Sequence, residues 1–213
     1  YMTDDPGLTG AFRNGIDVHR FTASIIFSKS IEDVTAAERR ISKTINFGIM
    51  YGMSAFRLSN ELGISRSEAS EFIKTYFDRY RGVRNFVEKT NKSAAELGYV
   101  KTEFGHIRDI IGINSSNKTE KAGAERVAVN TVIQGTAAEI MKKAMISIGE
   151  KLEEGGYKSK LLLQVHDELI FEVAEDEKDE IEKLVKETME GAVKLSVPLK
   201  ASIETAYCWG DMH

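Results

Sequence analysis

The sequence contains few of the residues from which several common kinds of protein site are built. A single cysteine, Cys208, excludes an internal disulfide and a cysteine-based zinc site, and makes a reducing, intracellular setting the default expectation. The 2 prolines form no linker, and there is no internal repeat. No apolar run approaches the roughly 20 residues that cross a bilayer, and the first residues, 1–5, lack a signal-peptide pattern. We therefore expect no membrane partner.

Composition and charge indicate a folded protein with an uneven charge distribution. Hydrophobic residues make up 42% and charged residues 29% of the 213 residues, which suits one or two domains with a core. Residues 1–130 carry 19 basic and 16 acidic side chains, whereas residues 131–213 carry 10 and 17. The segment 39–92 is the most basic, with 11 basic and 5 acidic side chains. A basic first half suits phosphate-bearing partners, although ordinary solvated helix faces give the same pattern.

Capping patterns and glycines divide the first part of the chain into helices. Thr35 and Glu38 form one capping-box pattern, and Ser65 and Glu68 form a second, so each pair marks the start of a helix. The sequence predicts a helical region at 9–28 broken by Gly15, helices at 35–51, 54–62 and 65–80, a break at Arg81-Gly82, a helix to about 97, a hairpin at 98–105 and a long helix at 119–154.

The second part of the chain changes to a strand pattern. Apolar runs at 160–165 and 169–173 predict a tight hairpin with His166-Asp167-Glu168 between its strands. An acidic helix at about 176–195 and a closing strand at 199–204 are predicted to follow. The expected fold class is α+β, with a mainly helical subdomain at 1–118 followed by an antiparallel-sheet subdomain with packed helices at 119–213.

Two cations and two aromatic rings recur at steps of four along the helix that begins after Thr35. Arg39, Lys43, Phe47 and Tyr51 therefore share one face, which drifts slowly around the helix. Cations can hold a triphosphate, and aromatic rings can pack on its sugar and base. Cations near a helix N-terminus are mildly unfavourable, so an anion is one reason for their position. The alternative is a basic helix end followed by an aromatic core contact.

The hairpin carries two adjacent carboxylates, Asp167 and Glu168, after His166. Holding carboxylates close together favours a cation, and Mg²⁺ prefers one or two carboxylates together with substrate phosphates. The alternative is a solvated turn. A His-Asp pair also occurs in metal-dependent phosphohydrolases, but the other histidines, His19, His106 and His213, show no matching pattern.

A polar stripe is predicted on the long helix, where Arg126, Asn130 and Gln134 again step by four. Arg, Asn and Gln are side chains that bond base edges and phosphates. The alternative is a set of buried polar groups that satisfy one another between helices.

Together these motifs resemble the family A DNA polymerases, of the DNA polymerase I type. Arg39 to Gly52 is similar to the family's nucleotide-binding fingers helix, Arg-x₃-Lys-x₃-Phe-Gly-x₂-Tyr-Gly. Gln164 to Glu168 is similar to the palm hairpin motif, and Arg126 to Ala138 to the helix at the primer–template minor groove. Asp17 to Arg20 resembles the start of the fingers, and the ending Trp209 to His213 resembles the family C-terminus.

The sequence also departs from the family pattern. Arg81 stands where a proline is common, His106-Ile107-Arg108 replaces a basic run, and Ile111-Gly112 replaces Pro-Asp. The family's first catalytic aspartate lies in an upstream strand motif, Asp-Tyr-Ser-Gln-Ile-Glu, and nothing in residues 1–30 resembles it. We therefore expect the chain to hold the fingers and about two-thirds of the palm, without the thumb.

The resemblance implies templated addition of deoxynucleotides to a primer 3′ end by two-metal nucleotidyl transfer. The implied residues are catalytic Asp167, Lys43 and Glu168; nucleotide-binding His19, Arg39, Lys43, Phe47 and Tyr51; DNA-binding Arg126, Asn130, Gln134 and His166; and metal-binding Asp167. The implied cofactor is two Mg²⁺ ions, and the implied partners are primer-template DNA, deoxynucleoside triphosphates and a second polypeptide that carries the other aspartate and the thumb. Alone, the chain is expected to be inactive.

Two other functions stay open. A non-catalytic nucleotide- or DNA-binding fragment would not need the carboxylate of Asp167, so its presence beside Lys43 and Arg39 argues against this alternative. A related single-subunit RNA polymerase shares part of the fingers motif, but Phe47 and the run from Gln164 to Glu168 favour the DNA enzyme. The expected location is the cytoplasm of a bacterial or phage-infected cell, with an organelle as the alternative.

Overall fold

The computed structural model describes residues 1–211, so Met212 and His213 of the family-like ending lie outside the described residues. The chain forms two compact units that meet between Thr136 and Ala137, within the long helix α7 (Lys118–Glu154). Helices combined with small antiparallel sheets confirm the predicted α+β class. The predicted subdomain boundary at residue 118 coincides with the first residue of α7, and the division into fingers and palm stays a prediction.

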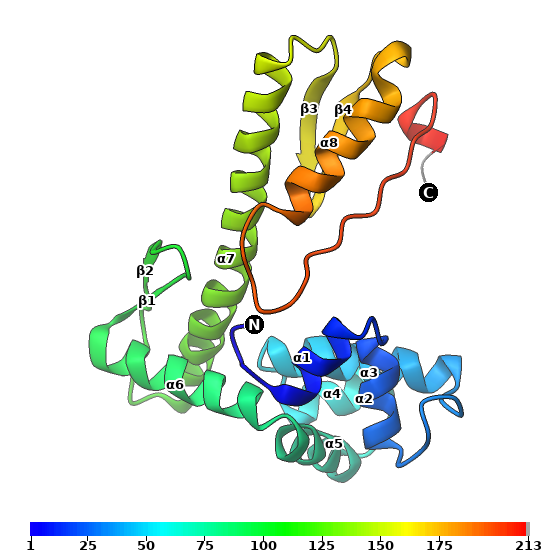
Figure 1. The fold of residues 1–213 in the computed structure, drawn as a ribbon. Coiled ribbons are helices and arrows are strands. Elements are labelled where there is room, and N and C mark those ends of the chain that lie inside the picture. Colours follow the sequence, from blue (N-terminus) through cyan, green and yellow to red (C-terminus); the bar gives the residue numbers. More distant parts are fainter. Residues whose placement is uncertain (212–213) are drawn as a thin grey trace. The chain divides into compact units, whose positions relative to one another are not determined.

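The first unit consists mainly of helices, which occur in the predicted order (Figure 1). They are followed by a short antiparallel hairpin and the first part of α7. The elements are α1 (Pro6–Arg13), α2 (Val18–Ile26), α3 (Ala36–Met50), α4 (Ala55–Leu62), α5 (Arg66–Arg79), α6 (Arg81–Leu97), β1 (Tyr99–Lys101) and β2 (Ile107–Asp109).

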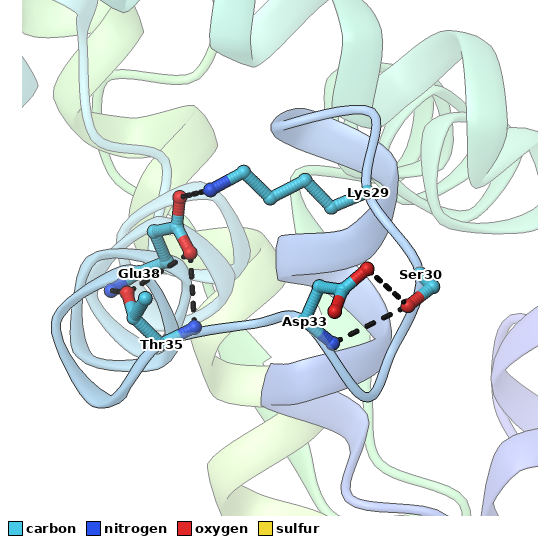
Figure 2. Close-up of polar contacts among 5 residues, drawn as sticks. All are labelled: Lys29, Ser30, Asp33, Thr35 and Glu38. Carbon is cyan, nitrogen blue, oxygen red and sulfur yellow. Dashed lines mark hydrogen bonds and ion pairs between the residues drawn. The ribbon is translucent and has the colours of Figure 1, made fainter.

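Helix α3 begins at the predicted capping box. The Thr35 hydroxyl accepts the Glu38 N–H at 3.2 Å, and the Glu38 carboxylate accepts the Thr35 N–H at 2.9 Å. Figure 2 shows that Lys29 reaches the same carboxylate from the preceding loop, where Ser30 and Asp33 hydrogen-bond each other. The entry to α3 is thereby fixed, because its first N–H groups and the loop before it both have side-chain partners.

The core of the first unit lies between α2, α3, α4 and α5. Ile45 and Leu58 are buried there with Tyr76 and Tyr80. Asp5 caps α1 and also accepts the Gly82 N–H at 3.0 Å, which ties the first helix to the start of α6. A second cluster, including Val100 and Ala128, joins the hairpin to α6 and α7.

The second unit combines the end of α7 with a hairpin and a further helix (Figure 1). Strands β3 (Lys160–Val165) and β4 (Glu168–Glu172) pair antiparallel, with a register shift between Leu161 and Leu163. A 3₁₀ turn, η1 (Glu175–Glu177), leads into α8 (Lys178–Glu190), and a second one, η2 (Trp209–Asp211), lies near the end of the chain. Apolar side chains of α7, α8 and β4 form the core of this unit, namely Ile148, Leu152, Ile181, Val185, Leu169 and Phe171.

Several predicted details are wrong. The segment 199–204 is not a strand, and the sheet of the second unit contains only β3 and β4 among the described residues. The backbone N–H of Ala201 instead donates to the Glu190 carboxylate at 3.1 Å. The acidic helix ends at Glu190, capped by Gly191, rather than near residue 195.

The ends of three other elements also differ from the prediction. The first helix begins at Pro6, because Asp5 caps it there. Tyr80 rather than Arg81-Gly82 separates α5 from α6, and Gly82 lies inside α6.

Within residues 1–211, no helix combines the length and the apolar character that crossing a bilayer requires.

Candidate functional site

The predicted cations and aromatic rings share one surface, here called the α3 face and defined as His19, Arg39, Lys43, Phe47 and Tyr51. The rings of Phe47 and Tyr51 are nearly parallel, at 11° and 6.3 Å between centroids. The His19 ring, from the first turn of α2, lies 5.7 Å from Phe47. Phe47 is 46% exposed and Tyr51 40%, so neither ring is a core contact. The predicted alternative of an aromatic core contact is therefore wrong.

Arg39 forms an ion pair with a carboxylate of the same chain, that of Asp17. Its Nε donates to Asp17 Oδ2 at 2.6 Å, while Asp17 Oδ1 caps α2 by accepting the N–H groups of His19 and Arg20. Partial burial alone would raise the pKa of Asp17, but the Arg39 bond and the backbone N–H groups outweigh it and lower this pKa. Arg39 is thus held in place, and its position by itself does not require an external anion.

Lys43 is the cation that lacks such an anion. Its side chain is exposed, one helical turn beyond Arg39, and has no hydrogen-bond or ion-pair partner within residues 1–211. A shallow pocket of about 300 Å³ opens beside Lys43, Phe47 and Tyr51. An exposed cation next to a pocket and two stacked rings fits a ligand that carries both negative charge and a flat ring.

His19 is held by a partner on another helix, α3. Its Nδ1 lies 2.9 Å from Nδ2 of Asn46, a buried residue on α3. Desolvation lowers the pKa of His19; Asp17 opposes this effect, whereas Arg39 and Lys43 add to it. The imidazole is therefore neutral at pH 7, when one of its nitrogens donates and the other accepts.

The α7 stripe, defined as Arg126, Asn130 and Gln134, lies on one helix as predicted. Arg126 and Gln134 are exposed, and the buried Oδ1 of Asn130 has no hydrogen-bond partner among the described residues. These side chains do not satisfy one another, which disfavours the purely structural alternative. Gly52, at the end of α3 with φ of 68°, packs directly on Arg126, because a Cβ on Gly52 would lie 2.5 Å from Arg126 Cγ.

The predicted carboxylates lie at the tip of the second unit's hairpin, here called the hairpin tip and defined as His166, Asp167 and Glu168. His166 and Asp167 form the two-residue turn, and Glu168 is already paired with Val165 as the first residue of β4. His166 has a left-handed backbone, with φ of 54°, and its carbonyl accepts a bond of 2.9 Å from Gln164 Nε2. All three residues are exposed, so the tip is open to a ligand.

The donor atoms of the hairpin tip suit Mg²⁺ in kind. Carboxylate oxygens are hard ligands, and one or two of them are what Mg²⁺ takes from a protein when phosphates supply the rest. Within residues 1–211, no group of three or more histidine, cysteine, aspartate or glutamate side chains is placed to hold a metal. Asp167 and Glu168 therefore match Mg²⁺ in the kind of donor atom only, and the described residues form no complete ligand set around them.

Sequence reasoning missed the residues that support the site. Asp17 and Asn46 lie inside the quoted motifs, but their roles depend on α2 packing against α3. One signal was present: asparagine is a poor helix former, so Asn46 between Ile45 and Phe47 indicates a polar contact. The close approach of Gly52 to Arg126 is likewise a contact between helices that no pattern within one helix predicts.

Known proteins that are similar to this chain include DNA polymerases. The model of DNA polymerase family A matches residues 1–211. DNA polymerase I of Streptococcus pneumoniae is 47% identical over 210 residues, covering 98% of this chain and 24% of that protein. DNA polymerase I of Treponema pallidum is 48% identical over 213 residues, covering 100% of this chain and 21% of that protein.

A solved structure gives the same result for the fold. It is described as the POL domain of Pol1 from M. smegmatis in complex with DNA primer-template and dNTP, with a TM-score of 0.90 and 44% identity. The match covers 93% of this chain and 35% of that one. The chain spans between a fifth and a quarter of the length of the curated relatives quoted above. From the family match over residues 1–211, the chain belongs to DNA polymerase family A.

Proposed function

We propose that this chain takes part in template-directed DNA synthesis, adding deoxynucleotides to a primer 3′ end by nucleotidyl transfer. The observation that supports this most directly is the α3 face, where Lys43, which has no partner among residues 1–211, and two stacked rings line a pocket. Arg39, anchored by Asp17, lies one helical turn before Lys43 on the same helix. Each of these groups matches a part of a deoxynucleoside triphosphate. The primer-template and dNTP in the similar Pol1 structure support the same substrates.

On this proposal the α3 face binds the incoming nucleotide. Arg39, Lys43 and His19 hold the triphosphate, Phe47 packs beside the sugar, and Tyr51 stacks near the base. The cations are in position before charge develops on the leaving pyrophosphate, which is the electrostatic part of the catalysis. Lys43, which has no hydrogen-bond or ion-pair partner among residues 1–211, is proposed to give a proton to that leaving group.

The α7 stripe and His166 are proposed to contact the minor groove and the primer end. Every correct base pair presents similar acceptors in that groove, so contacts there check pair geometry without reading sequence. Arg126 and Gln134 are exposed donors of the required kind. The contact between Gly52 and Arg126 joins this stripe to the end of α3, next to Tyr51.

The hairpin tip is proposed to hold metal. Asp167 would be the ligand, with Glu168 nearby in a secondary role, and the tip's exposure leaves the carboxylate accessible. When bound, a pair of Mg²⁺ ions supplies electrostatic stabilisation of the attacking and leaving oxygens. The described residues offer no larger carboxylate cluster. We therefore infer that a further carboxylate comes from outside them, namely from the second polypeptide that is expected to carry the other aspartate.

Primer extension with purified components tests the proposed function. The 213-residue chain is assayed with a primer-template, Mg²⁺ and either deoxynucleotides or ribonucleotides, alone and with a polypeptide carrying the upstream aspartate motif and thumb. We expect no extension by the chain alone and deoxynucleotide-specific extension by the pair. Binding of deoxynucleoside triphosphate is measured separately by calorimetry.

Each contrary outcome identifies a different error. Robust extension by the chain alone would contradict the need for a second polypeptide. Nucleotide binding without extension by the pair would favour the non-catalytic alternative, and preference for ribonucleotides would favour the RNA polymerase alternative. A cytoplasmic location remains a prediction.

A further inference from the structure

A buried hydrogen-bonded chain leads from the core of the first unit to His19. Tyr80 OH lies 2.9 Å from Thr22 Oγ1, and Thr22 Oγ1 donates to Asn46 Oδ1 at 3.1 Å. Asn46 Nδ2 then lies 2.9 Å from His19 Nδ1. Thr22 and Tyr80 are 0% exposed and Asn46 is 8% exposed, so water does not compete for these bonds.

The donors and acceptors of this hydrogen-bonded series from Tyr80 to His19 can be assigned. Burial raises the pKa of Tyr80 to about 12, so its phenol keeps its proton, and Thr22 Oγ1 is its hydrogen-bond partner. With Thr22 donating to Asn46 Oδ1, the amide turns its NH₂ group toward His19, which must then accept at Nδ1. The Thr22 hydroxyl also lies 2.8 Å from Val18 O, so a reversed arrangement, with His19 Nδ1 donating, is chemically possible and can be tested.

The ligand's chemistry distinguishes the two arrangements. Phosphate oxygens accept hydrogen bonds and cannot donate them, and a neutral imidazole has a single N–H to donate. For the free Nε2 of His19 to bind phosphate, the proton must therefore be on Nε2. Nε2 has no hydrogen-bond partner among residues 1–211, and the ring is partly exposed beside Phe47. Accepting at Nδ1 from Asn46 is what leaves the proton on Nε2.

We propose that Asn46 is a positioning residue for nucleotide binding, because its amide holds His19 in the Nε2-protonated tautomer and aims that N–H at the triphosphate. This inference rests on the proposed binding of a triphosphate to the α3 face. Tyr80 and Thr22 act through Asn46 by fixing which way its amide points. The charged groups around the ring are Asp17, Arg39 and Lys43.

The matched variant is Asn46→Asp. Aspartate has nearly the same shape and can still accept from Thr22, but it cannot donate to Nδ1. The new carboxylate should accept from a protonated Nδ1 and raise the pKa of His19. Asn60→Asp, on the exposed side of α4, makes the same charge change away from His19 and serves as the control.

The first measurement is ¹⁵N NMR of the histidine side chains in the 213-residue chain. The sequence has only 4 histidines, and His19→Gln identifies the signal of His19. We expect wild-type His19 to be neutral at pH 7, with the proton on Nε2, and Asn46→Asp to move a proton onto Nδ1, while Asn60→Asp leaves the signal unchanged. A proton on Nδ1 in the wild type, or no change in Asn46→Asp, overturns the inference.

The second measurement is the affinity for deoxynucleoside triphosphate. At a pH above the raised pKa of His19, the single proton on Nδ1 leaves Nε2 without a proton, and losing that bond to phosphate should weaken binding of dNTP by Asn46→Asp by about tenfold or more. In the His19→Gln background, Asn46→Asp should have no further effect, whereas a merely structural role would add its own loss. If Asn46→Asp does not fold, the wild-type tautomer alone decides the inference. If wild type binds no dNTP, the proposed function fails, but the tautomer result still stands by itself.

Discussion

The α3 face and the hairpin tip differ in whether their functional side chains have partners among the described residues. On the α3 face, Arg39 is anchored by Asp17, and His19 is anchored by Asn46. At the hairpin tip, the Asp167 carboxylate has no hydrogen-bond or ion-pair partner among residues 1–211, and the turn's side-chain contact goes to the His166 carbonyl. One region is preorganised, and the other presents an open carboxylate.

The difference shows which part of the function is local. A preorganised site loses little conformational freedom when a ligand binds, so the α3 face should bind a nucleotide with the residues it has. An exposed carboxylate in a two-residue turn has neither fixed neighbours nor a completed ligand set. We therefore expect substitutions of the hairpin-tip carboxylates, Asp167 and Glu168, to affect catalysis alone and substitutions on the α3 face to affect nucleotide binding as well.

Asp167→Asn gives the largest expected effect and tests this separation directly. In the complete polymerase, primer extension should fall about 10³-fold or more, because a metal ligand contributes several kcal/mol to the transition state. Nucleotide affinity of the α3 face should stay unchanged. Glu172→Gln, at the far end of β4, is the control for lost charge on the same hairpin. Near-normal extension by Asp167→Asn would show that the metal role is misassigned.

Lys43→Ala is expected to have the next largest effect. Loss of a general acid and phosphate ligand should slow extension roughly 10²- to 10⁴-fold, and it should also weaken binding of dNTP. Arg57→Ala removes one positive charge from exposed α4 and should leave both measurements unchanged. Unaltered nucleotide affinity in Lys43→Ala would remove the α3 face from the binding site and break the comparison.

The sequence predicted the elements that rest on local rules. The capping boxes at Thr35 and Ser65 lie where the patterns place them, and the helix predicted at 54–62 ends at Leu62, where Gly63 caps it. The strand predicted at 199–204 is wrong, because a strand needs a neighbouring strand to pair with, and the local sequence does not show whether one is available. Gly82 failed for a related reason: a Cβ there would lie 2.3 Å from Thr3 O, so this glycine allows close approach rather than ending a helix.

The same distinction applies to the site. Steps of four placed Arg39, Lys43, Phe47 and Tyr51 on one face, because that spacing is a property of a single helix. The partner of Arg39 comes from α2, and no pattern within α3 could reveal it. The supporting contacts are tertiary, so they became visible only once the packing of α2 on α3 was known.

Gly52→Ala tests whether the α3 face is coupled to the α7 stripe. Both Gly52 and Gly63 have left-handed backbones, with φ of 68° and 65°, so alanine should cost about 1–2 kcal/mol of stability at either position. Only at Gly52 would the new Cβ displace Arg126, since nothing lies within 4 Å of a Cβ at Gly63. We expect a several-fold weaker affinity for primer-template in Gly52→Ala alone. Equal DNA affinity in the two variants, measured by fluorescence anisotropy, would argue against the coupling.

Glu38→Gln is expected to have the smallest effect, and it tests whether the order of the α3 face depends on the cap of its own helix. The Lys29 bond, with the N–H and hydroxyl of Thr35, lowers the pKa of Glu38 from 4.5 to about 2 (Figure 2). Because the folded pKa is depressed, this stabilisation is complete above pH 4.5 and is lost as the pH falls toward about 2. Glutamine keeps the capping bond but carries no charge.

The urea midpoints of wild type and Glu38→Gln should therefore differ near neutral pH and converge as the pH approaches about 2. Glu32→Gln, in the exposed loop before α3, should follow the wild type throughout. A difference between wild type and Glu38→Gln that does not change with pH would mean that the charge of Glu38 contributes nothing to the cap. In that case the α3 face would depend on its packing against α2, and the contacts of Asp17 and Asn46 would carry its order.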